Sequence, residues 1–163
     1  MTPAPKTPFF DASGRALTLA ELLANAEGHP LLLAFFKVGC PTCRLAWPYV
    51  QKLHALYGGT AVRVAGVCQD TAAEGAAFYR ENGKATFDLL VDPEPRFAAS
   101  NAFDVESVPH LVLLSPGAAV KKTVTGWSKR EMEALGRELA EAKGLAERPV
   151  VEPADPVKEW QAG

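Results

Sequence analysis

The sequence predicts a single α/β domain, and three observations support that prediction. Short apolar runs alternate with segments of helical spacing along most of the chain. Leu31–Phe36 is apolar throughout, as a strand covered on both faces is, and Ala61–Cys68 is apolar except for Arg63 and predicts a second buried strand. The chain has 163 residues, of which 48% are hydrophobic, so it is long and apolar enough to bury one sizeable core.

The helices of this domain are predicted from their first residues. A capping box places Ser or Thr before the helix and Glu three residues later, and it occurs at Thr18, Thr71 and Ser128. A further helix is predicted from Cys40 to Tyr57, because leucine and tyrosine recur there at helical spacing and two glycines follow. Pro48 inside that helix predicts a kink. A short helix is also expected over residues 93–102.

The remaining strands are predicted from shorter apolar runs between turn residues. Phe9–Asp11 precedes Ser13-Gly14 and predicts a short strand and a turn, and Phe87–Val91 predicts another short strand. Leu111–Leu114 and Val120–Val124 flank a Ser-Pro-Gly turn and predict a hairpin.

The end of the chain has a different composition. After Gly144, prolines alternate with acidic residues, so we expect no regular element there. The segment could fold over the domain or contact a second copy, and for this composition a mobile segment is the default expectation. It does contain four apolar side chains, more than a linker needs: Val150, Val151, Val157 and Trp160. We therefore predict a folded domain over residues 1–144 and a proline-rich tail over residues 145–163.

Charge and hydropathy exclude several classes of protein. The net charge of -2 predicts no basic surface for nucleic acid. No stretch reaches the roughly 18 apolar residues of a membrane helix, and the first residues lack the apolar core of a secretion signal. We expect a cytoplasmic protein, or a periplasmic one if a leader has been removed. An unpaired Cys68, which we interpret as a small buried hydrophobe, fits a reducing compartment better than an oxidising one.

The most informative motif is Cys40-Pro41-Thr42-Cys43, which follows a buried strand and opens a helix. Unpaired N–H groups and the positive end of the helix dipole favour a thiolate at that position. Cys40 is nearer the helix start and is the predicted nucleophile. Cys43 lies one turn deeper and is predicted to resolve the mixed disulfide that Cys40 forms. The motif therefore predicts a dithiol–disulfide redox site.

A zinc half-site is the alternative interpretation of the same motif. A tetrahedral zinc site needs four ligands, and the chain has no second CxxC and no pair of histidines at ligand spacing. His29, His54 and His110 are isolated from one another in the sequence. We therefore expect neither a metal nor any cofactor beyond the redox-active Cys40–Cys43 pair.

These motifs together resemble the thioredoxin superfamily over residues 7–143. The resemblance rests on the CxxC, Pro48, the Val108-Pro109 step and Gly126 in this order. Within that superfamily the chain is most similar to the TlpA/ResA branch, related to the AhpC/TSA redoxins. The resemblance implies a thioredoxin-like fold: a central mixed β-sheet flanked by helices, with an N-terminal hairpin and a helix–strand insertion over residues 71–91.

The resemblance also implies roles for individual residues. Pro109 corresponds to the cis-proline opposite the disulfide, and the backbone of Val108 would pair with an extended substrate. Asp70 matches a carboxylate that accepts the proton of Cys43, although it could equally help to cap the next helix. Gly39 stands where most members carry Trp, and Ala34 where thioredoxins carry a buried acid. The candidate substrate-binding residues are Gly39, Pro41, Thr42, Val108, Pro109 and His110.

Three functions are consistent with these residues. The first is a thiol–disulfide oxidoreductase that reduces protein disulfides and is recharged by an external dithiol donor. The second is a peroxiredoxin-like thiol peroxidase, since residues 66–70 resemble the corresponding strand of those enzymes, although Cys40 occupies the position where they carry Thr. The third is a non-catalytic thioredoxin-like binding module whose CxxC is an oxidised staple. We expect a monomer or a weak dimer with no nucleic-acid partner.

Overall fold

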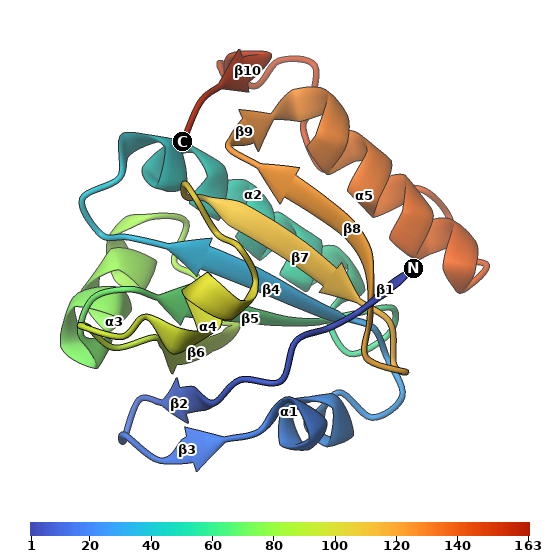
Figure 1. The fold of residues 1–163 in the computed structure, drawn as a ribbon. Helices are drawn as coiled ribbons and strands as arrows, with labels where there is room; N and C mark the ends of the chain where they lie inside the picture. The colour runs from blue at the N-terminus through green and yellow to red at the C-terminus, as the bar shows by residue number, and fades with distance from the viewer.

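The computed structural model describes residues 1–163 and contains one eight-stranded mixed sheet with helices on both faces (Figure 1). The strand order is β1-β8-β7-β4-β5-β6-β2-β3. The central strand β4 is parallel to β5 and antiparallel to β7, so the sheet is mixed, as the sequence predicts. No helix combines the length and the apolar composition that crossing a membrane requires.

The sheet strands are β1 (Thr2–Pro3), β2 (Phe9–Asp11), β3 (Ala16–Leu17), β4 (Leu31–Phe36), β5 (Arg63–Cys68), β6 (Asp88–Val91), β7 (His110–Leu114) and β8 (Ala119–Thr125). A separate pair consists of β9 (Trp127–Ser128) and β10 (Trp160–Gln161). The helices are α1 (Leu19–Asn25), α2 (Pro41–Tyr57), α3 (Ala72–Glu81), α4 (Ala98–Ala102) and α5 (Lys129–Ala142). The fourth helix is shorter than the predicted 93–102, because residues 93–97 form a turn that ends at Phe97 in the left-handed conformation.

The three predicted caps are confirmed. Thr18, Thr71 and Ser128 each accept a hydrogen bond from the backbone N–H three residues later, which satisfies a donor that the helix leaves unpaired. At Thr71 the reciprocal bond from the Thr71 N–H to Glu74 is also present. These caps fix where the helices begin, and so fix the loops at the end of the sheet that carries the cysteines.

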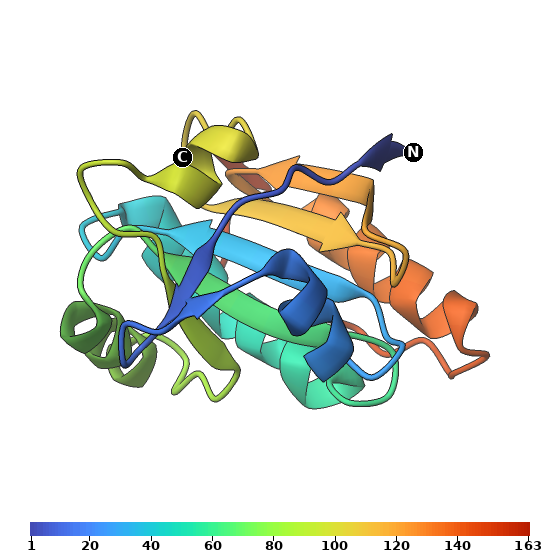
Figure 2. The same ribbon diagram turned by 60° about the horizontal axis from the view of Figure 1, so that its bottom comes forward.

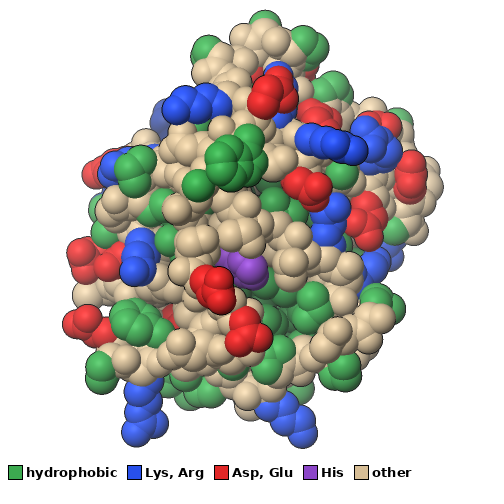
Figure 3. Space-filling model, turned by 45° about the horizontal axis from the view of Figure 1, so that its top comes forward, with side chains coloured by type: hydrophobic (Ala, Val, Ile, Leu, Met, Phe, Trp, Pro, Cys, Tyr) green, Lys and Arg blue, Asp and Glu red, His purple; other side chains and the backbone are tan.

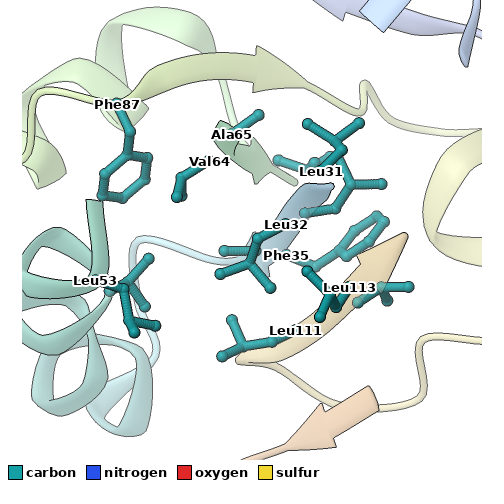
Figure 4. Packing of buried hydrophobic residues seen from close by; sticks show 14 of the residues in the cluster. Leu31, Leu32, Phe35, Leu53, Val64, Ala65, Phe87, Leu111 and Leu113 are labelled. Atoms are coloured by element: carbon teal, nitrogen blue, oxygen red, sulfur yellow. The ribbon is translucent and has the colours of Figure 1, made fainter. Parts of the chain in front are cut away.

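Helices α2, α3 and α5 cover one face of the sheet, while α4 lies on the other (Figure 2). Neighbouring residues of β4 therefore pack in opposite directions. Phe36 contacts Trp47 of α2 with ring centroids 4.3 Å apart, and Phe35 contacts Phe103, beyond α4, at 5.8 Å. Figure 4 shows the leucines of β4 and β7 and Leu53 of α2 in this core. Every side chain of β4 is buried, so the strand leading to the CxxC is rigidly held.

The prediction of a mobile tail without a regular element is wrong. Val150 and Val151 are 0% and 4% exposed and belong to the hydrophobic core. Further on, β10 pairs antiparallel with β9, with Gln161 opposite Trp127. Apolar side chains between the prolines anchor the segment, so its proline-rich composition alone did not predict its structure. The tail thereby returns to the end of the sheet where α2 begins (Figure 1).

Candidate active site

The two cysteines of the CxxC lie at the first turn of α2. Cys40 is the N-cap residue, with an extended backbone, and Pro41 is at the first helical position, where its missing N–H costs no hydrogen bond. The Cys43 N–H donates to Cys40 Sγ at 3.0 Å. The sulfur of Cys40 thus occupies the place of the oxygen in an ordinary helix cap, and an N–H donor there favours negative charge on the sulfur.

The two sulfurs have different surroundings. Cys40 is partly exposed and its thiol donates to the Val108 carbonyl at 3.4 Å. Cys43 is wholly buried. Burial, reinforced by the adjacent Cys40 thiol, raises the pKa of Cys43 far above its ordinary value. Both residues are free thiols in contact with each other, so one sulfur is accessible and the other is held protonated beneath it.

The loop before β7 forms the wall opposite Cys40. The Val108–Pro109 peptide bond is cis, and both residues are buried. The Pro109 carbonyl accepts from the Gly126 N–H at 2.8 Å, which ties this loop to the start of β9. The Glu94–Pro95 bond is also cis, a feature for which the sequence provided no signal.

Asp70 lies beside the site, at the end of β5. Its carboxylate accepts from the Val38 N–H at 2.8 Å and thereby holds the loop between β4 and Cys40. The backbone N–H of the adjacent Lys37 favours the thiolate of Cys43. Asp70 thus has a direct hydrogen bond to the loop that leads to the CxxC. Thr71, not Asp70, caps α3.

The other candidate residues divide into two groups. Gly39 and Pro41 are exposed next to Cys40, where a partner can reach them. His110 is 9% exposed and its Nδ1 lies 2.9 Å from Thr125 Oγ1, while burial lowers the pKa of its imidazole. It is thus a neutral histidine held within the sheet. Thr42 is 4% exposed and faces the tail, since its hydroxyl donates to the Ala162 carbonyl at 2.6 Å.

A small polar hollow of about 200 Å³ adjoins Val108 on the side of α4. Its walls include Lys37, Ser100 and Glu106. The molecule has no group of three or more His, Cys, Asp or Glu side chains placed to hold a metal ion. Residues 161–163 also contact the site, and sequence reasoning missed them; the only signal was the apolar content of the tail.

Comparison with known proteins places this geometry in a family. The AhpC/TSA family model matches residues 2–143. The thiol-disulfide oxidoreductase ResA of Bacillus subtilis (strain 168) is 22% identical over 129 residues, which cover 79% of this chain and 69% of ResA.

Solved structures agree on the fold. A Chlorobium tepidum protein described as thiol:disulfide interchange protein DsbE is 21% identical with a TM-score of 0.70, and the match covers 87% of this chain and 95% of that one. A secreted disulfide oxidoreductase of Mycobacterium tuberculosis is 19% identical with a TM-score of 0.63, covering 82% and 94%. These neighbours confirm the thioredoxin-like fold, and the secreted one gives no support to a cytoplasmic location. The chain belongs to the AhpC/TSA family and is a TlpA/ResA-like member of the thioredoxin superfamily.

Proposed function

We propose that this protein is a thiol–disulfide oxidoreductase that reduces disulfide bonds of partner proteins through Cys40 and Cys43. One observation carries the proposal: two thiols in contact at a helix start, one accessible and capped by an N–H, the other buried with a raised pKa. Such a pair can attack a disulfide with the first sulfur and release it with the second. The names of the relatives above support the same activity.

In the first step the Cys40 thiolate attacks one sulfur of the partner's disulfide. A bond forms between Cys40 Sγ and that sulfur, the partner's S–S bond breaks, and the leaving sulfur departs as a thiolate that takes up a proton. The Cys43 N–H at 3.0 Å supports negative charge on Cys40 before the attack. Because Cys43 is buried and protonated, it does not compete for the partner's disulfide.

In the second step Cys43 loses its proton and attacks Cys40 Sγ. The Cys40–Cys43 disulfide forms, the mixed disulfide breaks, and the partner leaves with both of its sulfurs reduced. Two electrons have then passed from the dithiol to the partner. An external dithiol donor must reduce the Cys40–Cys43 disulfide before the next cycle.

Asp70 is proposed to accept the proton that Cys43 loses. Its position at the end of β5, bonded to Val38 in the loop before Cys40, supports this role. The route to the buried sulfur is indirect, since the carboxylate bonds to the Val38 N–H and not to Cys43 itself. Removal of its charge is therefore expected to affect the second step and not the first.

The partner's chain is proposed to dock beside Cys40 on the cis-Pro109 loop. Val108 makes no hydrogen bond to another backbone group, so its N–H remains available for an extended segment. Gly39 and Pro41 are exposed next to the reacting sulfur and complete this surface. His110 is buried within the sheet and belongs to the wall of the site, whereas Thr42 is covered by residues 161 and 162 of the tail.

We also propose that the reaction takes place outside the cytoplasm. The secreted relative supports this location. Cys68 does not argue against it, because a thiol that is 0% exposed and lies beneath α3 is shielded from oxidants in any compartment.

The proposed function is tested by trapping the intermediate. Cys43→Ser removes the resolving thiol, so a mixed disulfide between Cys40 and a protein such as insulin is expected to accumulate to near-stoichiometric amounts. Mass spectrometry with and without dithiothreitol measures it. The Cys40→Ser variant should form no adduct, and Cys68→Ser added to Cys43→Ser should leave trapping unchanged.

If no reducible adduct accumulates in Cys43→Ser, the resolving role of Cys43 is wrong. Rapid consumption of peroxide by the wild type without insulin reduction would favour the peroxidase instead.

A further inference from the structure

Residues 158–163, here called the strap, lie along the edge of the proposed docking surface. The strap runs antiparallel to β9, and its two ladder positions are Trp160 opposite Ser128 and Gln161 opposite Trp127. The Lys129 N–H donates to the Glu159 carbonyl at 2.9 Å. The indole N–H of Trp127 donates to the Lys158 carbonyl at 2.6 Å. The strap is therefore an extended peptide added to a short strand.

The strap next contacts the CxxC itself. The hydroxyl of Thr42, between the two cysteines, donates to the Ala162 carbonyl at 2.6 Å. The same hydroxyl accepts from the side-chain amide of Gln161 at 2.8 Å. Thr42 is separated by 120 residues in sequence from Ala162, so these bonds exist only in the folded chain. Both hydrogen-bonding roles of the Thr42 hydroxyl are used by the strap.

The strap ends against the cis-proline loop. A Cβ at Gly126 would lie 2.8 Å from the Gln161 carbonyl oxygen and 3.2 Å from the Gly163 nitrogen, so only glycine admits the strap at this point. A Cβ added at Gly163 would collide with the Val108 carbonyl. That carbonyl also accepts the Cys40 thiol at 3.4 Å. Gly163 and the reacting sulfur thus approach the same atom of the molecule.

We propose that the strap is an internal peptide that occupies the docking surface of the partner protein, and that it must leave before the partner's disulfide reaches Cys40. This inference rests on the proposed function. The unpaired N–H of Val108 is the edge to which an extended partner would add, and Gly163 lies against this residue. The surface fits a partner segment in extended conformation. One backbone carbonyl of that segment would accept the Thr42 hydroxyl, and a small residue of the segment would lie against Val108.

The strap is more exposed to solvent than the start of the tail. Val150 and Val151 are buried and fix the start of the tail, whereas Trp160 is 64% exposed and Ala162 and Gly163 are also exposed. Figure 3 shows this end of the molecule, where Lys or Arg and Asp or Glu side chains are interspersed and acidic side chains lie beside a histidine near the centre. The strap bonds to the buried side chains of Thr42 and Trp127 through backbone carbonyls, and the backbone carbonyls of a partner can replace them. The anchored valines keep the strap close and let it return.

Gly163→Val tests the proposal in the 163-residue chain, because its side chain cannot fit against the Val108 backbone. Gly117→Val is the matched control, since a Cβ there meets nothing closer than Ser115 Oγ at 3.8 Å. Release of the strap is measured as faster hydrogen exchange of the Lys129 amide, which bonds to Glu159. If the strap is closed in about nine molecules of ten, its release raises kcat/KM for insulin reduction roughly tenfold. Gly117→Val is expected to match the wild type.

Three outcomes decide the matter. Faster exchange at Lys129 with unchanged or slower insulin reduction would overturn the proposal, because the strap would then not compete with the partner. Unchanged exchange at Lys129 in the double variant Gly163→Val, Gln161→Ala would also overturn it, because residues 161–163 would then not hold the strap.

If even the wild type fails to reduce insulin, the proposed function fails. The strap is then judged by alkylation of Cys40 with iodoacetamide, which Gly163→Val should accelerate and which, if unchanged, refutes the strap.

Discussion

Two buried thiols, Cys43 and Cys68, have similar environments and different expected roles. Both are 0% exposed, and burial raises the pKa of both, that of Cys68 to about 11. Cys43 contacts Cys40, which is partly exposed. Cys68 instead donates to the Thr71 carbonyl at 3.8 Å and accepts from the Asp70 N–H at 3.4 Å.

This comparison separates burial from redox function. A buried thiol is unreactive toward a visiting disulfide, whatever its position. Cys43 can react because the adjacent Cys40 forms the mixed disulfide that Cys43 then attacks. Cys68 has no such partner in the proposed reaction. The pairing of an accessible sulfur with a buried one, and not burial itself, is what identifies the redox site.

The largest expected effect is the pH dependence of the step that Cys43 performs. Because its pKa is raised, Cys43 is a neutral thiol at neutral pH, and its thiolate fraction grows about tenfold per pH unit. The rate constant for release of the partner should therefore rise with pH between pH 6 and 9, by about tenfold per unit where solvent takes the proton and less steeply where Asp70 takes it. Stopped-flow absorbance after mixing the reduced protein with a disulfide dye measures this step as release of the second dye thiolate.

Cys68 supplies the control for that measurement. Cys68→Ala should give the same pH profile, since its sulfur does not take part. A plateau at neutral pH that persists in Asp70→Asn would show that Cys43 ionises there, and the unequal acidity of the two sulfurs would have to be abandoned.

A smaller effect is expected from Asp70→Asn. The asparagine oxygen can still accept from the Val38 N–H, so the loop is retained and only the charge is lost. If Asp70 accepts the proton of Cys43, release at pH 7 should slow by about tenfold, while the first attack by Cys40 is unchanged. The same stopped-flow traces separate the two steps. Release at the wild-type rate in Asp70→Asn but not in Asp70→Ala would assign Asp70 a purely positioning role.

Much of the fold was predictable because it depends on local signals. The capping residues Thr18, Thr71 and Ser128 mark helix starts through bonds that span three residues. Strand β4 was predicted with its observed bounds, Leu31–Phe36, because a fully buried strand is apolar throughout. The CxxC combined both signals, a buried strand followed by a helix start, so the position of its sulfurs followed from the sequence.

The surroundings of the site were less predictable because they depend on contacts between distant residues. Thr42 is a predicted substrate-binding residue, and the bond of its hydroxyl to the strap, 120 residues away, had no signal in the sequence around it. His110 is next to the cis-proline in sequence, but strand pairing directs its ring toward Thr125 and Phe35. Asparagine, proline and glycine predict where the chain turns, but they do not predict which strand the C-terminal residues pair with.

The smallest expected effect on the reaction comes from Cys68→Ala, which should change insulin reduction by less than about twofold, since the residue lies outside the site. The substitution is expected to change how the free energy of unfolding depends on pH. A thiol that ionises near pH 9 in the unfolded chain and about 11 when folded stabilises the protein below pH 9 and loses that contribution between pH 9 and 11. The wild type should therefore lose about 1–2 kcal/mol more than Cys68→Ala between pH 8 and 10.5, as measured by urea unfolding. Parallel declines in the two proteins would mean that Cys68 ionises as readily folded as unfolded, and the contrast with Cys43 would then rest on access alone.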